Sequence, residues 1–343
     1  MKLKQPINPF GHAVDISNCK TFSEAMEVSK LNYTVSKASI YAKTEIPNTI
    51  NDKNANNLVA FDNMYCPVEN NYSTYRTDTG QQFGIVKGNY EIVQNNVAFS
   101  WFDNNIGRDG LQLDKAGYFS YGGMIFISVK LNNNYIKVGK DDIENYLVFS
   151  NSHDGSNGVR ILFTPIRIIC KNTLVSAIKT SDNYVSFKHT KNVIQSINTA
   201  SEVLGITKIK IAETDELYNT LYKKAMYDVD VLNYLSKNIF NDEEIIKINK
   251  VTNNNILKVF NRSSDLVDTI SVNKLNKFTD ICEYYVSGYG QKEIRGTAWG
   301  AYNAVTGYIS NVKNFNNSDK RTKDILFGTD YNANVNALKL IMN

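Results

Sequence analysis

The sequence has little of the residue types that build most metal and nucleophilic sites, with four cysteines and three histidines among 343 residues. The cysteines are far apart, include no CxxC pair, and do not combine with the histidines at spacings that zinc requires. No metal and no cofactor is therefore predicted. The N-terminus lacks the apolar segment of a signal peptide, and no run approaches the roughly 18 apolar residues of a membrane span. We therefore expect a cytoplasmic protein with no membrane partner.

Arginine is also scarce, since seven arginines accompany 31 lysines. Asn, Lys, Ile and Tyr have AT-rich codons, so their abundance reflects genome composition, and a single exposed Lys or Asn says little about function. The arginines are better indicators of function, and they are Arg76, Arg108, Arg160, Arg167, Arg262, Arg295 and Arg321.

The first half of the chain reads mainly as strands. An amphipathic stretch near residues 22–31 predicts a short helix, and residues 48–57 read as a loop. Strands are expected at 75–80, 82–86, 118–131 (kinked at Gly122-Gly123), 146–151 and 159–170, with a turn at 153–158. Helices are expected at 95–102 and at 171–180, where Asn172 or Thr173 would be the N-cap.

The second half has apolar residues at helical spacing. Helices are expected in seven runs, at 193–204, 217–226, 229–235, 243–260, 266–286, 297–312 and 335–342. Strands followed by helices predict an α+β protein, with an N-terminal antiparallel sheet and packed helices followed by an all-helical C-terminal region. We divide it into an N-terminal arm or small cap (1–70), an α+β core domain with a basic hairpin and helix (71–190), and a helical C-terminal region (191–343).

Positive charge is concentrated between residues 156 and 191. Six basic residues stand there against one acidic residue, Asp182, a net charge of +5 where the whole chain has +4. Such a stripe is expected of a surface that binds a polyanion, because neutralising phosphates releases condensed counterions. A solvated face balanced by acids elsewhere in the fold is the competing interpretation. The predicted phosphate contacts are Arg160, Arg167, Lys171, Lys179 and Lys188.

Arg160 and Arg167 can both contact phosphate only if they lie on the same face of the sheet. Arg160 and Arg167 are seven residues apart, so a regular strand would place them on opposite faces. We expect a bulge or a kink at Pro165 to bring both to one face, because an arginine is costly in a core. Tyr118 and Tyr121 on the preceding strand are candidates for stacking on bases, although strand aromatics usually pack in a core or across strands.

A catalytic interpretation rests on His153, Asp154 and Arg167. A histidine beside a carboxylate can act as a general base where a turn brings the two together, and Gly155 and Gly158 indicate a turn. The simpler interpretation is that Asp154-Gly155 is turn chemistry and His153 a polar strand end. We favour the structural interpretation and assign no catalytic residue.

Two segments resemble a known family. Residues 151–156 (NSHDGS) and 163–174 (FTPIRIICKNTL) are similar to the signature of the phage/plasmid-like proteins of domain-of-unknown-function family 932. Residues 75–102 and 296–306 (GTAWGAYNAVT), followed by Arg321 and Leu326-Phe327-Gly328, look similar too. The resemblance implies a bacteriophage or related mobile element as the source, and the expected location is then the host cytoplasm. The resemblance carries no activity. His153, Asp154, Gly155, Asn172 and Thr173 are thus motif residues without an assigned role.

The order of helix, antiparallel strands and basic helix is also similar to the core of Rad52-like single-strand annealing proteins, which oligomerise and bind single-stranded DNA. The leading hypothesis is a non-enzymatic nucleic-acid-binding protein, a homo-oligomer that favours single-stranded DNA, acting in recombination, replication or repair. The alternatives are a nucleic-acid- or nucleotide-processing enzyme using His153, Asp154 and Arg167, and a structural or host-takeover interaction protein. Function does not follow from fold, so a site must decide among them.

Overall fold

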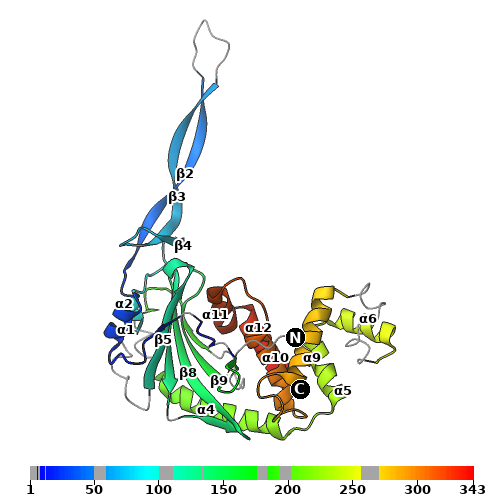
Figure 1. Ribbon diagram of the computed structural model, residues 1–343. Helices are drawn as coiled ribbons and strands as arrows, with labels where there is room; N and C mark the ends of the chain where they lie inside the picture. Colours follow the sequence, from blue (N-terminus) through cyan, green and yellow to red (C-terminus); the bar gives the residue numbers. More distant parts are fainter. Residues whose placement is uncertain are drawn as a thin grey trace.

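A computed structural model describes the chain from residue 6 to 343 with gaps. The described residues are 6, 8–11, 13–49, 59–99, 111–132, 134–175, 184–193, 202–255 and 270–343. Strands dominate the first half and helices the second, which confirms the α+β class (Figure 1).

An antiparallel sheet forms the centre of the first half. Its spatial order is β1 (Val14–Asp15), β5 (Leu111–Phe119), β6 (Met124–Leu131), β8 (Asp141–Ser152), β9 (Val159–Arg167) and β10 (Asn172–Thr173). Two further strands complete it, since β7 (Ile136–Val138) pairs with β8 and β11 (Tyr184–Phe187) pairs with β9. The predicted hairpin of β8 and β9 and its turn are confirmed.

Both faces of this sheet are covered, which explains why β6, β8 and β9 are almost continuously apolar. One face, with Ile127, Phe149 and Ile161, packs on α1 (Phe22–Val28) and α2 (Asn95–Phe99). The other face carries Phe126, Val148 and Leu162 and packs on Phe10 and on Leu326 of the C-terminal region. Side chains alternate along each strand, so neighbouring residues enter different cores.

The helical region is built around one helix that is buried on every side. Its members are α4 (Glu202–Lys223), α5 (Asp228–Lys237), α6 (Asp242–Thr252), α9 (Val272–Ser287), α10 (Ala298–Asn311), α11 (Ser318–Phe327) and α12 (Thr329–Met342). Every residue of α10 is buried, which is typical of a helix at the centre of a core. Helices α4, α5, α9 and α12 contact it, and strand β10 contacts it from the sheet.

A long two-stranded ribbon extends away from the rest of the molecule (Figure 1). It consists of β2 (Val35–Thr49) and β3 (Val59–Arg76), which pair from Val35 and Arg76 as far as Thr49 and Val59. Within the described part of the chain, strand β4 (Gln82–Lys87) pairs only with residues 71–75 of β3, near the base. The predicted loop at 48–57 lies mostly outside the described residues, and its first two residues belong to β2. We call the β2–β3 ribbon the arm.

Several local predictions were wrong. Residues 118–131 do not form one kinked strand, because Ser120 and Tyr121 have positive φ angles and turn the chain back, so that β5 and β6 form a hairpin. No helix was predicted at 318–327, where α11 begins at a capping Asn317.

The predicted basic helix at 171–180 is also absent where the structure describes those residues. Lys171 has a φ of 52° and ends a turn, and Asn172 and Thr173 then pair with β9 as β10. A left-handed residue followed by ladder pairing leaves no helical N-cap at this point. Residues 176–180, including Lys179, lie outside the described residues.

Candidate functional site

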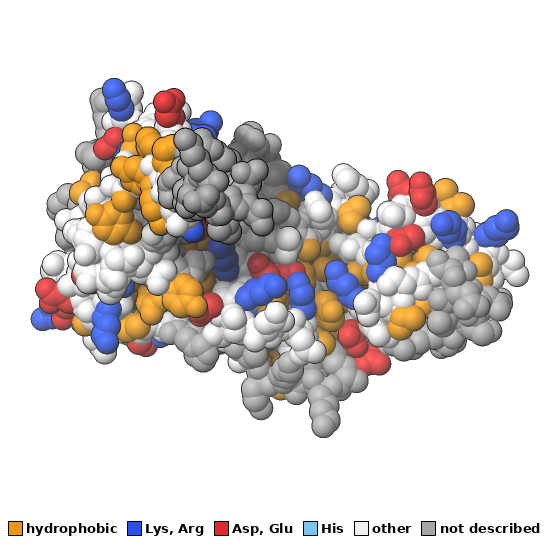
Figure 2. Space-filling model, turned by 90° about the horizontal axis from the view of Figure 1, so that it is seen from above, with side chains coloured by type: hydrophobic (Ala, Val, Ile, Leu, Met, Phe, Trp, Pro, Cys, Tyr) orange, Lys and Arg blue, Asp and Glu red, His pale blue; other side chains and the backbone are white. Residues whose placement is uncertain are grey.

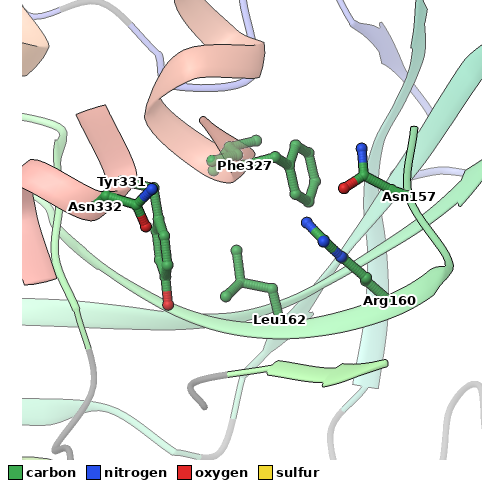
Figure 3. Close-up of a pocket in the computed structure, with 7 residues that line it drawn as sticks. Asn157, Arg160, Leu162, Phe327, Tyr331 and Asn332 are labelled. Atoms are coloured by element: carbon green, nitrogen blue, oxygen red, sulfur yellow. The ribbon is translucent and has the colours of Figure 1, made fainter. Parts of the chain in front are cut away.

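The most chemically suggestive cavity lies between strand β9 and helices α11 and α12. It has a volume of about 210 Å³ and a mainly polar lining. Its lining residues are Asn157, Arg160, Leu162, Leu326, Phe327, Tyr331 and Asn332. Arg160 reaches into it from β9 toward Phe327 and Asn157, while Tyr331 lies across from them beside Leu162 (Figure 3). We call this cavity the Arg160 cleft.

The fold explains why Arg160 points into this cleft. Along β9, Val159, Ile161 and Phe163 enter the core under α1, so Arg160 and Leu162 face α11 and α12. Ser150 of β8 lies directly opposite Arg160. The Ser150 hydroxyl is buried, and no hydrogen-bond partner for it exists within the part of the chain that the structure describes. The lining of the cleft therefore combines a guanidinium, two amides and aromatic rings, with the Ser150 hydroxyl on the neighbouring strand.

Arg167 does not join Arg160. The pairing of β8 with β9 runs without interruption from Ile143 opposite Arg167 to Ser150 opposite Arg160. The break expected at Pro165 is absent, so the odd spacing places the two arginines on opposite faces, about 23 Å apart along the strand.

Arg167 is a buried structural ion, and its predicted contact with phosphate is wrong. Its side chain is completely inaccessible and lies 2.7 Å from the Asp141 carboxylate. The same nitrogen donates to the Gly290 carbonyl at 2.9 Å, and Trp299 Nε1 donates to Asp141 at 3.0 Å. Pairing with a carboxylate and a carbonyl satisfies the charge within the fold, so nothing draws it to the surface.

The remaining predicted contacts are scattered. Lys188 is exposed and follows β11, whose Phe187 pairs with Val159, so it lies at the same end of β9 as Arg160. Lys171 lies beyond the opposite end of that strand. Tyr118 and Tyr121 are exposed by 48% and 77% at the β5–β6 turn. The continuous stripe predicted from sequence is therefore not formed by the described residues.

His153 is enclosed in the structure and not a polar strand end. Its Nε2 lies 2.7 Å from Asn95 Oδ1, and its ring stacks on Phe83 with Tyr33 nearby. The backbone is fixed as well, because its carbonyl accepts a hydrogen bond from Thr74 at 2.7 Å. Burial, and to a smaller extent His189, lowers the pKa of His153 to about 3, against a small opposing effect of Asp154.

Asp154 and Gly155 serve the turn, as the simpler interpretation predicted. The Asp154 carboxylate accepts a hydrogen bond from the Ser156 amide at 2.9 Å, and Gly155 has a φ of +76°. His153 lies ten residues further along β8 than Ile143, which pairs with Arg167, so His153 and Arg167 are about 33 Å apart along the sheet. The fold does not bring the three residues of the catalytic hypothesis together.

Two of the motif residues, Asn172 and Thr173, join the sheet to the helical region. Asn172 Nδ2 lies 3.3 Å from Asn303 Oδ1, and the side-chain oxygen Oδ1 of Asn172 accepts a hydrogen bond from Asn311 Nδ2 at 2.8 Å. The Thr173 carbonyl accepts a hydrogen bond from Asn334 at 3.3 Å. Two segments that carry the family resemblance, 163–174 and 296–306, thus meet in one buried polar interface. We call this interface the β10–α10 joint.

Sequence reasoning missed Tyr331 and Asn332 of the Arg160 cleft, and it gave Phe327 no role. The residues come from α11 and α12, more than 160 positions after Arg160, and no local pattern links such distant segments. The one usable signal was the Leu326-Phe327-Gly328 run in the resemblance.

These observations define an α+β protein whose sheet and helical region share one buried polar joint. The chain belongs to the family described as a domain of unknown function, DUF932, whose model matches residues 82–329. No curated protein and no solved structure matches the chain. Among the described residues, no helix is long and apolar enough to cross a membrane, and no three His, Cys, Asp or Glu side chains cluster as metal ligands would.

Proposed function

We propose that the protein binds single-stranded DNA of a phage or related mobile element, with Arg160 as the central contact, in recombination, replication or repair. The observation that carries this proposal is the chemistry of the Arg160 cleft. A guanidinium contacts phosphate or stacks on a base, an aromatic ring offers a second stacking surface, and asparagine amides hydrogen-bond to base edges.

The size and setting of the cleft fit a single strand better than a duplex. At about 210 Å³ it is smaller than most drug-sized pockets, so it has room for one small group such as a single base and not for a duplex. Exposed Lys188 extends the positive charge at the same end of β9. Figure 2 shows further Lys and Arg side chains, with Asp and Glu side chains among them, in the middle of this face of the molecule. A strand could follow that charge while one base enters the cleft.

The enzymatic alternative loses its motif, because His153 and Arg167 are buried and far apart. The resemblance to Rad52-like annealing proteins depended on a basic helix after the strands, and residues 171–173 form a turn and strand β10 instead, so this analogy adds no support. In the alternative of an interaction protein, the exposed arm would be the interaction surface.

The test is binding of a fluorescently labelled oligothymidine, measured by anisotropy over a series of salt concentrations. Arg160→Gln should weaken binding and reduce the slope of log affinity against log salt by about 0.7, the value for one lost phosphate contact on a single strand. Phe327→Leu keeps the apolar contact of Phe327 with Phe119 but removes the stacking ring. It should cost about 1–3 kcal/mol of binding with an unchanged salt slope.

The matched control is Lys250→Gln on α6, far along the chain from the cleft, which should leave affinity nearly unchanged. Failure of the wild-type protein to bind oligothymidine at low salt would overturn the proposal. Equal loss of binding in Lys250→Gln would show a diffuse electrostatic surface instead of a site. Tighter binding to an RNA oligomer of the same length would replace DNA by RNA as the ligand.

A further inference from the structure

The arm leaves backbone edges without a partner. Among the described residues, β2 pairs only with β3, and β4 covers only residues 71–75 of β3. Residues 41–45 of β2 are all exposed. An open strand edge of this kind presents free N–H and C=O groups to any strand that can pair with it.

The arm also exposes apolar surface that water does not stabilise. Tyr41 and Tyr65 are 57% and 65% exposed, and Met64 and Val68 are exposed as well. A two-stranded ribbon alone is marginally stable, so a projecting arm of this length favours a partner. The charges of its strands cancel, with Lys37, Lys43 and Arg76 against Glu45, Asp62 and Glu69. That balance does not suit a polyanion and suits a protein strand.

The sequence of β2 is complementary to itself about Thr44. If two β2 strands pair antiparallel with Thr44 opposite Thr44, residue 43 of each lies opposite residue 45 of the other. Lys43 then faces Glu45 twice, and directly opposite residues of opposite charge stabilise a strand pair. Pro47 has no N–H to donate, which limits this pairing to residues 42–46.

We propose that the outer edge of β2 is a self-association surface, on which a second copy of this chain pairs antiparallel about a two-fold axis at Thr44. The interface is isologous, so it closes at two copies and does not propagate into a fibre. It is small and independent of the Arg160 cleft, and dimerisation is therefore expected without nucleic acid.

Charge exchange tests the register, with the mass of the particle measured by analytical ultracentrifugation. A small interface gives a weak dimer, so protein is studied up to about 100 µM. Wild type should dimerise, whereas Lys43→Glu and Glu45→Lys should each be monomeric, because each places like charges opposite one another. An equimolar mixture of the two variants should dimerise again, since the two glutamates of one variant then face the two lysines of the other.

A disulfide gives a second measurement. In a Cys66→Ser background, Thr44→Cys should form a covalent dimer on oxidation, because the two Cα atoms of a non-hydrogen-bonded pair approach to about 4.5 Å. Ser39→Cys in the same background is the control, since residue 39 does not oppose itself. Circular dichroism of each variant confirms folding.

A monomeric wild type, or single variants that dimerise like wild type, would overturn the proposal. So would a mixture that stays monomeric, or cross-linking as efficient at residue 39 as at residue 44. Dimerisation that appears only with oligothymidine would show that the DNA, and not the β2 edge, joins the copies.

Discussion

Replacing Arg167 by alanine should destabilise the protein strongly without weakening the DNA binding that we propose for the Arg160 cleft. The substitution removes the 2.7 Å ion pair with Asp141 and the hydrogen bond to the Gly290 carbonyl. Asp141 is only 6% exposed in the protein, and the substitution leaves Trp299 Nε1 as the remaining donor to its carboxylate among the described residues. An uncompensated buried carboxylate is the main cost.

The expected loss is about 3–5 kcal/mol of unfolding free energy, as for other buried pairs that lose one partner. For a chain of 343 residues that unfolds in one step, an unfolding entropy of about 2.1 cal/mol/K per residue converts this loss to a decrease of roughly 4–7 °C in melting temperature. Denaturant unfolding and calorimetry measure the two quantities. Lys171→Ala, at a nearby lysine that is only half-buried, should cost well under 1 kcal/mol.

A second substitution separates the ion pair from simple loss of packing. Adding Asp141→Asn to Arg167→Ala removes the uncompensated charge, so the double variant should be more stable than Arg167→Ala alone. If the double variant is less stable, or if Arg167→Ala leaves stability unchanged and lowers the salt slope of DNA binding, the buried-ion reasoning is refuted.

Two further predictions concern the turn between β8 and β9. Because burial lowers the pKa of His153 from 6.5 to about 3, the unfolded chain binds a proton between these pH values that the folded protein excludes. Stability should therefore fall with decreasing pH in this window, by up to about 1.4 kcal/mol per pH unit, and denaturant titrations should show a shallower fall in His153→Gln. An identical pH dependence in the variant would place the cause elsewhere. Gly155→Val should cost more than 1 kcal/mol of unfolding free energy, because φ is +76° and an added Cβ would lie 3.0 Å from Val86. Gly80→Val is the control with a similar φ of +72° and open space, so equal losses in the two variants would show that the Val86 contact contributes nothing.

The fold class and most elements could be predicted because they depend on local pattern. The apolar runs of β8 and β9, the turn at Gly155 and the helical spacing of α10 all follow from neighbouring residues. The arm was missed because the described side chains of its outer part are exposed whether polar or apolar, so its strands lack the alternation of a half-buried strand.

The site was harder to predict than the fold. The alternation of side chains along β9 correctly places Arg160 and Arg167 on opposite faces. The expected break at Pro165, which would have brought them to one face, was wrong. Proline at this position costs one ladder bond without shifting the register. Whether an arginine is a surface contact or a buried ion depends on Asp141 and Gly290, which no local pattern around Arg167 reveals.

The β10–α10 joint has a consequence for the order in which the chain acquires its structure. Asn172 meets Asn303 across 131 residues, and Arg321 donates to the Asn8 carbonyl at 3.0 Å across 313 residues. During synthesis, the strands of the sheet leave the ribosome long before α10 and α11 exist to cover them. Contacts between such distant residues slow folding, because the entropy cost of closing a long loop comes before the stabilising contacts form. The face of the sheet that packs on α11 therefore stays exposed to solvent until nearly the whole chain has been synthesised.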